Sequence, residues 1–431
     1  MATRQLQYPG PAWLPLDDKR IRIYVDTLFV EGALRPIPFP QAQQLDDSWA
    51  LIGVETTPQA HRLARMKKLL PALKKEIPNA DASHTQWFQF AFRWAELTTL
   101  ILASAADLPS DVRRAYNTLM PQVDAAILAW ANQRYRTLIH LPPSPPVMLH
   151  HIPRYLARLL EDDPRARVAL VLLDGLSLDQ WLVLRDVLQS GGKEWRVHDD
   201  AVFAWVPTIT PVSRQAAFSG KPPVYFRESI NTTAKEEALW RAFWHGEDLS
   251  SRQVGYLKGL GDTSDLGRVG DLLSHPKLRA IGLVINKVDD IMHGMELGAA
   301  GMHNQVRQWA ESGFLSELLM QLHANGFQVF LTSDHGNIEA QGIGQPREGV
   351  TADVRGARVR IYNDEGLRAR VQREFPDALS WPSIGLPDDY LPLLAPARAA
   401  FTQKGKTIVG HGGLSVEELI VPFIHISPKS P

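Results

Sequence analysis

An unbroken apolar run at residues 168–173 ends in Asp174 and Gly175, and it limits the folds that this chain can adopt. A run without polar alternation is typical of a strand that is buried on both faces. A helical pattern follows at residues 178–189. In open α/β sheets the carboxyl end of a strand faces the crevice where ligands bind, so Asp174 is a candidate functional residue. Taken alone, the Asp-Gly pair fits a simple turn equally well.

Strands and helices alternate along the rest of this region. Further strands are predicted at residues 201–206, 253–257, 280–285, 329–332, 359–362 and 419–426, and helices at 152–160, 213–219 and 303–324. This alternation favours an α/β fold, with a mostly parallel sheet sandwiched by helices. Residues 221–270 and 336–410 are predicted to be insertions over the carboxyl edge of the sheet, the second with a single strand.

Residues 1–145 are predicted to form an N-terminal helical domain. Helical spacing of apolar residues indicates helices at 57–77, 86–103 and 110–130, the last bent at Pro121. A proline-rich connector, residues 141–146, separates this domain from a second one at 146–431. The basic side chains of residues 62–75 fit either a stripe that faces nucleic acid or a solvated helix face.

The amino-acid composition excludes several kinds of functional site. The 431-residue chain has a formal net charge of −1 and no cysteine. Disulfides, thiolate metal sites and cysteine nucleophiles are therefore excluded, and a metal would need Asp, Glu, His or hydroxyl ligands. No apolar signal core and no run of membrane-spanning length is present. We expect a cytoplasmic protein without a membrane partner.

A second polar cluster, residues 207–214, follows the predicted strand 201–206. Its Thr210 and Ser213 lie where a helix begins, and backbone N–H groups there attract anions. A hydroxyl in that place suits attack on phosphate, although it also fits a helix cap.

Three more clusters carry metal-ligand side chains. Asp289 and His293 are four residues apart and share one face of a helical turn, as a ligand pair or as a surface pair. Asp334 and His335 follow the predicted strand 329–332, and His411 lies between glycines. Together with Asp174 and Thr210, these residues suit two divalent ions about 4 Å apart, which can activate a nucleophile and stabilise displacement at phosphorus.

The order of these motifs resembles the alkaline phosphatase superfamily: Asp, then Pro-x-x-Thr, Asp-x-x-x-His, Ser-Asp-His-Gly and a late Gly-His-Gly-Gly. The segments at residues 172–181, 213–223 and 410–418 resemble a PglZ-domain protein, and the likeness covers about residues 150–427. The resemblance implies an alkaline-phosphatase-like fold. PglZ-domain proteins occur in phage-defence systems of the BREX type.

The resemblance also implies a role for each matching residue. One metal ion would be held by Asp174, Thr210, Asp334 and His335, and the other by Asp289, His293 and His411. Thr210 would be the nucleophile that forms a covalent phospho-enzyme. It lies ten positions before Gly220, as the nucleophile does in the nucleotide phosphodiesterase branch, whereas Ser177 is interpreted as a helix cap. Arg214, four positions after Thr210, is a candidate phosphate or transition-state clamp.

Three functions remain open at this point. The first is a metal-dependent phosphodiesterase or nuclease that acts on nucleotides or nucleic acid, with contacts at residues 62–75 and 347–360. The second is a phosphomonoesterase or phosphomutase that uses the same two ions. The third is a non-catalytic assembly subunit that binds other defence proteins through residues 1–145. Zn²⁺ is the first choice of metal, with Mn²⁺ or Mg²⁺ as alternatives.

Overall fold

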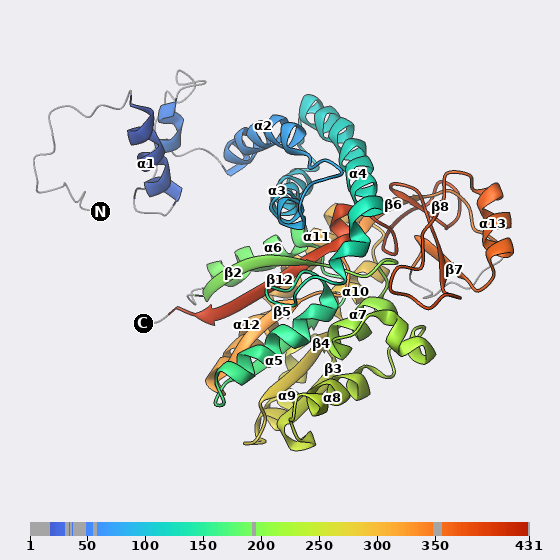
Figure 1. The fold of residues 1–431 in the computed structure, drawn as a ribbon. Helices are drawn as coiled ribbons and strands as arrows, with labels where there is room; N and C mark the ends of the chain where they lie inside the picture. Colours follow the sequence, from blue (N-terminus) through green and yellow to red (C-terminus); the bar gives the residue numbers. More distant parts are fainter. Residues whose placement is uncertain are drawn as a thin grey trace, which may run out of the picture. The chain divides into compact units, whose positions relative to one another are not determined.

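The computed structural model describes residues 18–30, 34, 37, 49–54, 58–191, 195–347 and 356–429 (Figure 1). The chain divides into two compact units, Met1–Arg65 and Met66–Pro431. The first contains α1 (Lys19–Val30) and the short helix η2 (Trp49–Gly53). Residues 1–17, where no apolar signal core is expected, lie outside the described residues. No helix in the described ranges is long and apolar enough to cross a membrane.

Three long helices confirm the helical pattern predicted before residue 140. They are α2 (Pro58–Glu76), α3 (His84–Ala103) and α4 (Ser110–Leu138). Helix α3 begins at a capping box, in which Ser83 and Gln86 satisfy each other's backbone N–H groups. On α2 the lysines at 67, 68, 74 and 75 are exposed, whereas Met66, Leu69 and Leu73 are buried.

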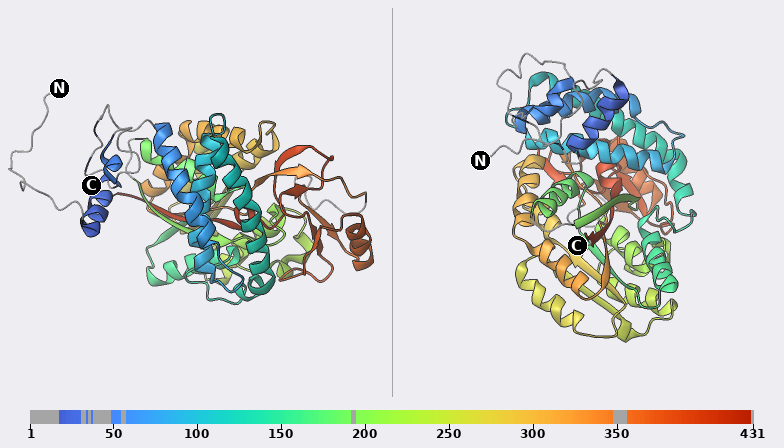
Figure 2. Two further views of the ribbon diagram at one scale, coloured as in Figure 1. Left: turned by 90° about the horizontal axis from the view of Figure 1, so that it is seen from above. Right: turned by 90° about the vertical axis from the view of Figure 1, so that its left-hand side faces the viewer.

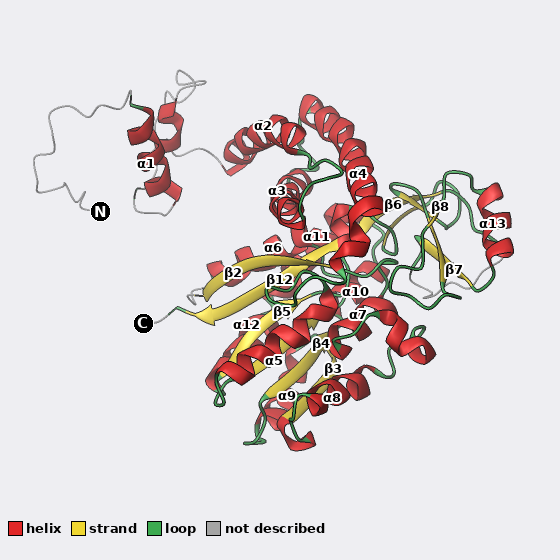
Figure 3. Cartoon of the chain, in the orientation of Figure 1, coloured by secondary structure: helices red, strands yellow, loops and turns green. Residues whose placement is uncertain are grey.

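A six-stranded sheet in the order β2-β12-β5-β1-β4-β3 forms the centre of the second unit (Figure 3). Strands β5 (Phe327–Thr332), β1 (Arg167–Leu173), β4 (Ala280–Ile285) and β3 (Val254–Leu260) run parallel. Strand β12 (Ile420–Pro428) is antiparallel to β5 and to β2 (Trp195–Phe203). The predicted α/β class with a mostly parallel sheet is confirmed.

Helices cover both faces of this sheet (Figures 1 and 2). One face carries α5 (Ile152–Asp162), α7 (Thr210–Ser219) and α8 (Glu236–Gly246), and the other carries α6 (Leu178–Ser190), α11 (Gly298–Glu311) and α12 (Phe314–Ala324). Val168, Leu170 and Leu172 alternate along β1 and are buried with Trp240 and Trp244 of α8. Burial of β1 on both faces explains its unbroken apolar run. The remaining short helices are η3 (Leu149–His151), η4 (Pro223–Ser229), η5 (Ser251–Gln253), η6 (Thr263–Asp265), α9 (Leu266–Leu273), α10 (Lys287–His293) and α14 (Val416–Leu419).

Several predicted boundaries were wrong. The helix predicted at 303–324 is two helices, α11 and α12, because Gly313 adopts a left-handed conformation with φ of 86° between them. The strand predicted at 201–206 ends at Phe203 and begins earlier, at Trp195. The helix predicted at 213–219 begins at Thr210.

Residues 336–410, which were predicted to be an insertion, contain more strands than the one predicted. β6 (Ile338–Gly342), β10 (Ala399–Ala400) and β11 (Thr407–Gly410) form one small sheet, and β7 (Val359–Tyr362), β9 (Leu391–Leu394) and β8 (Leu379–Ser380) form another beside α13 (Glu365–Glu374). Most of these strands are too short to give a periodic pattern. Arg358 and Arg360, proposed as nucleic-acid contacts, are buried, and residues 348–355 lie outside the described residues.

Candidate metal centre

The site lies where three neighbouring parallel strands end. Leu173 of β1 is paired with Ile285 of β4, and Leu172 with Thr332 of β5, so the segments that follow these strands emerge side by side. They carry Asp174, helix α10 and the Ser-Asp-His-Gly segment at 333–336. The order of the strands therefore brings Asp174 together with side chains that lie more than a hundred residues later in the sequence.

The first ligand group consists of Asp174, Asp334 and His335, whose ligand atoms all lie within 4.8 Å of one another. All three side chains are buried. Thr210 joins this group, because its Oγ1 lies 3.0 Å from His335 Nε2. The other ring nitrogen of His335, Nδ1, lies 3.0 Å from the Gly336 carbonyl oxygen. A proton on Nδ1 would leave the Nε2 lone pair directed at Thr210.

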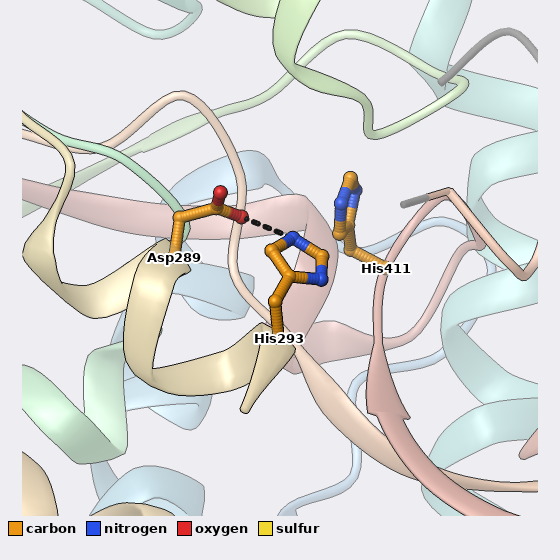
Figure 4. A group of neighbouring side chains, drawn as sticks. All are labelled: Asp289, His293 and His411. Atoms are coloured by element: carbon orange, nitrogen blue, oxygen red, sulfur yellow. Dashed lines mark hydrogen bonds and ion pairs between the residues drawn. The ribbon is translucent and has the colours of Figure 1, made fainter. Parts of the chain in front are cut away.

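The second group consists of Asp289, His293 and His411, again within 4.8 Å of one another (Figure 4). Asp289 and His293 are one turn apart on α10 and are joined by a 3.0 Å contact between Oδ1 and Nε2. His411 Nδ1 lies 2.9 Å from the Thr208 carbonyl oxygen, which fixes the ring. The His335 and His411 rings stack with centroids 3.8 Å apart, so the two groups are adjacent.

Buried acceptor atoms in the first group are suited to a cation. Asp174 Oδ1 and Asp334 Oδ2 accept no hydrogen bond from any of the residues that the structure describes. A buried carboxylate oxygen without a donor is costly unless a cation is bound there. Six oxygen and imidazole ligands in two adjacent groups match the donor preference of divalent Zn²⁺ or Mn²⁺. The residues present therefore fit divalent metal ions.

Electrostatics support the same conclusion. Burial, together with the nearby Asp174 carboxylate, raises the pKa of Asp334 well above its usual value. Burial also raises the pKa of Asp174, despite the opposing charge of Arg214. Burial lowers the pKa of His335 to about 4, so its imidazole is uncharged at neutral pH and can bind a metal. Carboxylates that repel each other and neutral imidazoles are both stabilised by a bound cation.

Thr210 lies at the first residue of α7, preceded by Ile209 at the N-cap. Pro211 follows it and suits the first turn, where a backbone N–H is not needed. Gly220, with φ of 62°, ends the helix in a left-handed conformation. The hydroxyl groups of Ser213 and Ser177, the other two candidates, have structural roles. Ser213 Oγ accepts a hydrogen bond from Trp205 N, and Ser177 occupies the N-cap of α6, as predicted.

Arg214 is buried between two carboxylates. One guanidinium nitrogen donates to Asp174 Oδ2 at 2.6 Å, and Nε donates to Glu236 Oε1 at 2.6 Å. The Tyr256 hydroxyl donates to the other oxygen of Glu236. Arg214 thus orients Asp174, and its role as a phosphate clamp stays a proposal.

Two buried glutamates that support the site were not predicted. Glu236 holds Arg214 and lies in a polar helical stretch without any motif, so no sequence signal pointed to it. Glu418 is fully buried and accepts hydrogen bonds from Gly413 N and Arg358 Nε, which fixes the loop after His411. The Ser-x-x-Glu spacing of Ser415 and Glu418 is a capping-box signal that could have identified it.

Comparisons with known proteins place the chain in a family. The family described as the BREX system PglZ alkaline phosphatase-like domain matches residues 152–426, more than half of the chain. No curated protein shows significant sequence similarity. Similar solved structures include ectonucleotide pyrophosphatase/phosphodiesterase 5 from mouse (14% identity, TM-score 0.47, 60% of this chain and 88% of that one) and from human (13%, 0.42, 60% and 87%). Phosphonoacetate hydrolase from Sinorhizobium meliloti 1021 is another (13% identity, TM-score 0.38, 62% and 92%). On the strength of the family match, the chain belongs to the PglZ family of alkaline phosphatase-like proteins.

Proposed function

We propose that the chain is a metal-dependent phosphodiesterase that uses Thr210 as its nucleophile, acts on nucleotides or nucleic acid, and serves in phage defence. The contact between Thr210 Oγ1 and His335 Nε2 carries the proposal, because it puts a hydroxyl group against one set of ligands and beside the other. The family description supports the link to defence.

The residues of the chain can each perform a defined part. One ion would be held by Asp174, Asp334, His335 and Thr210. The other ion would be held by Asp289, His293 and His411. Zn²⁺ is the first choice, and Mn²⁺ or Mg²⁺ would also fit. When bound, such ions lower the pKa of a coordinated hydroxyl and stabilise negative charge on phosphate. Arg214 keeps the Asp174 carboxylate in place through its 2.6 Å hydrogen bond.

Thr210 is well placed for attack. The α7 N-terminus concentrates N–H dipoles around its hydroxyl, and these dipoles favour negative charge on Oγ1 and on a bound phosphate. In the proposed reaction Oγ1 forms a bond to phosphorus while the ester P–O bond breaks and releases an alcohol. Water then hydrolyses the threonine phosphate and regenerates the hydroxyl group.

A pair of substitutions at Thr210 tests this proposal. We expect Thr210→Ala to lower the cleavage of bis(p-nitrophenyl) phosphate by at least about a thousandfold, while Thr210→Ser, which keeps a hydroxyl, retains part of the activity. Activity should be measured with Zn²⁺, Mn²⁺ and Mg²⁺ in turn. Asp334→Asn should reduce both activity and bound metal, as measured by elemental analysis.

The other functions predict different results. Cleavage of p-nitrophenyl phosphate without cleavage of the diester would favour a phosphomonoesterase or phosphomutase. If the folded protein shows no turnover with any metal, the third function is favoured, which is a non-catalytic subunit that binds defence proteins through residues 1–145. Equal activity of Thr210→Ala and the unmodified chain would exclude Thr210 as the nucleophile.

A further inference from the structure

A cavity of about 700 Å³ lies at the end of α7 opposite to Thr210. Its walls come from the end of α4, the beginning of α5, residues 221–225 and residues 383–385. Helix α7 has 10 residues, so the two ends are roughly 15 Å apart at 1.5 Å per residue. None of the seven side chains assigned to the metal centre lines this cavity. We name it the α7 cavity.

The α7 cavity is cationic. Arg136, Arg154 and Lys221 line it and are exposed. None of the three has a carboxylate partner among the residues that the structure describes, and no Asp or Glu is part of the lining. Arg154 Nε donates to the Gly220 carbonyl oxygen at 3.2 Å, which holds that guanidinium at the wall. The cavity therefore concentrates three cationic side chains without an acidic neighbour in its wall.

A nearby arginine outside the cavity differs from these three cations, because it has a carboxylate partner. Arg227, two residues after the lining residue Tyr225, is exposed and forms an ion pair with Asp389 at 2.6 Å. His150 and His151 add no charge to the cavity at neutral pH, because burial lowers their pKa values to about 3 and 4. The positive field comes from the two arginines and the lysine, which are directed to one concave space.

Much of the remaining wall is apolar, and it includes one accessible aromatic ring. Ile139, Leu141 and Pro222 line the cavity, and the Tyr225 side chain is 72% exposed. An exposed tyrosine ring can stack on a nucleobase, and arginine and lysine bind phosphate. The volume lies within the range of small-molecule sites, about 300–1,000 Å³. We propose that the α7 cavity binds a nucleoside phosphate, with its phosphates on Arg136, Arg154 and Lys221 and its base against Tyr225.

Calorimetric titration of the full chain with ATP tests this site. We expect ATP to bind in the presence of EDTA, because no residue of the cavity requires a metal. Arg154→Ala and Lys221→Ala should each weaken binding by about tenfold, since each removes a charge-assisted contact to phosphate. Lys404→Ala, which removes an exposed lysine outside the lining, is the matched control and should bind like the unmodified chain.

Ligand fragments separate the two halves of the site. Tripolyphosphate and adenosine should each bind more weakly than ATP, and tripolyphosphate bound as tightly as ATP would disprove the nucleoside part of the proposal. A short single-stranded DNA distinguishes the source of the ligand. If the DNA strand binds more tightly than ATP, and Lys221→Ala weakens its binding by a similar factor, the natural ligand is nucleic acid. If ATP binds more tightly than the strand, the natural ligand is a free nucleotide.

The proposal is independent of phosphodiesterase activity. Thr210→Ala should keep ATP binding in EDTA, because Thr210 lies at the other end of α7. The whole proposal would be overturned by the absence of ATP binding in EDTA, or by binding of Arg154→Ala and Lys221→Ala that equals that of Lys404→Ala. Unfolding curves of the variants check that the exposed substitutions leave the fold intact.

Discussion

Arg214 shows how one side chain can both stabilise and orient a charged site. Its side chain is 5% exposed and lies between those of Asp174, which is also 5% exposed, and Glu236, which is fully buried. Removing a buried cation leaves its carboxylate partners without compensation, which costs far more than the loss of a surface ion pair. Asp174 therefore depends on Arg214 for its position as well as its charge.

We expect Arg214→Gln to lower the free energy of unfolding by about 3–5 kcal/mol in EDTA. The matched control is Arg227→Gln, because Arg227 and Asp389 form an exposed pair and should contribute at most about 1 kcal/mol. Urea unfolding followed by tryptophan fluorescence measures both. If the two substitutions lower the free energy of unfolding by the same amount, Arg214 does not compensate the buried charges of Asp174 and Glu236.

Gly336 has no room for a side chain. A Cβ atom at this position would lie 1.9 Å from the Glu417 carbonyl oxygen, which belongs to the backbone and cannot rotate away. We expect Gly336→Ala to destabilise the chain by about 1–3 kcal/mol and to shift the adjacent His335. Gly246→Ala is the control, since a Cβ there meets nothing within 4 Å. A urea midpoint for Gly336→Ala equal to that of Gly246→Ala would contradict this close packing.

At the scale of elements, the turn before α5 is sensitive to acid. Val147 N and Met148 N both donate to His151 Nδ1 at 3.2 Å, and the His150 ring packs against Trp205. Burial lowers the pKa of His150 to about 3 and that of His151 to about 4, from 6.5. The unfolded chain therefore binds these protons first, and stability is lost as pH falls from 6.5 toward 4.

We expect a loss of about 2 kcal/mol for each histidine between pH 6.5 and pH 5. His150→Phe keeps a ring against Trp205 but cannot take up a proton, so its unfolding free energy should fall less steeply in this range. The exposed His275, replaced in the same way, serves as the control. Parallel slopes for His150→Phe and the unmodified chain would show that His150 does not contribute to acid unfolding.

The sequence predicted well those elements whose pattern lies within a short stretch of neighbouring residues. The apolar runs of β1, β4 and β5 identified buried strands, and the polar residues that follow them were found because parallel strands end at one edge. Glu236 was missed, since its partner Arg214 is 22 residues away and no local pattern links them. The small sheets of the insertion were missed for a related reason, because short strands acquire stability from non-local pairing.

At the scale of the whole second unit, helices α3 and α4 are bound to the part of the chain that carries the site. Trp94 Nε1 on α3 donates to Glu417 at 3.0 Å, and Asp124 on α4 pairs with Arg398. The Trp130 ring stacks on Phe203 of β2. These contacts cross the predicted boundary at 145/146, which stays a prediction, and they bury aromatic surface that would otherwise meet water.

A fragment of residues 146–431 would test that boundary. Removal of α3 and α4 exposes Phe203 and leaves Glu417 and Arg398 without Trp94 and Asp124. We therefore expect the fragment to aggregate or to unfold without a cooperative transition, as seen by gel filtration and by calorimetry. The control is Asp124→Asn in the full chain, which removes one ion pair but keeps the aromatic contacts and should unfold cooperatively. A monomeric fragment that unfolds cooperatively near the temperature of the full chain would instead make residues 146–431 an independent domain.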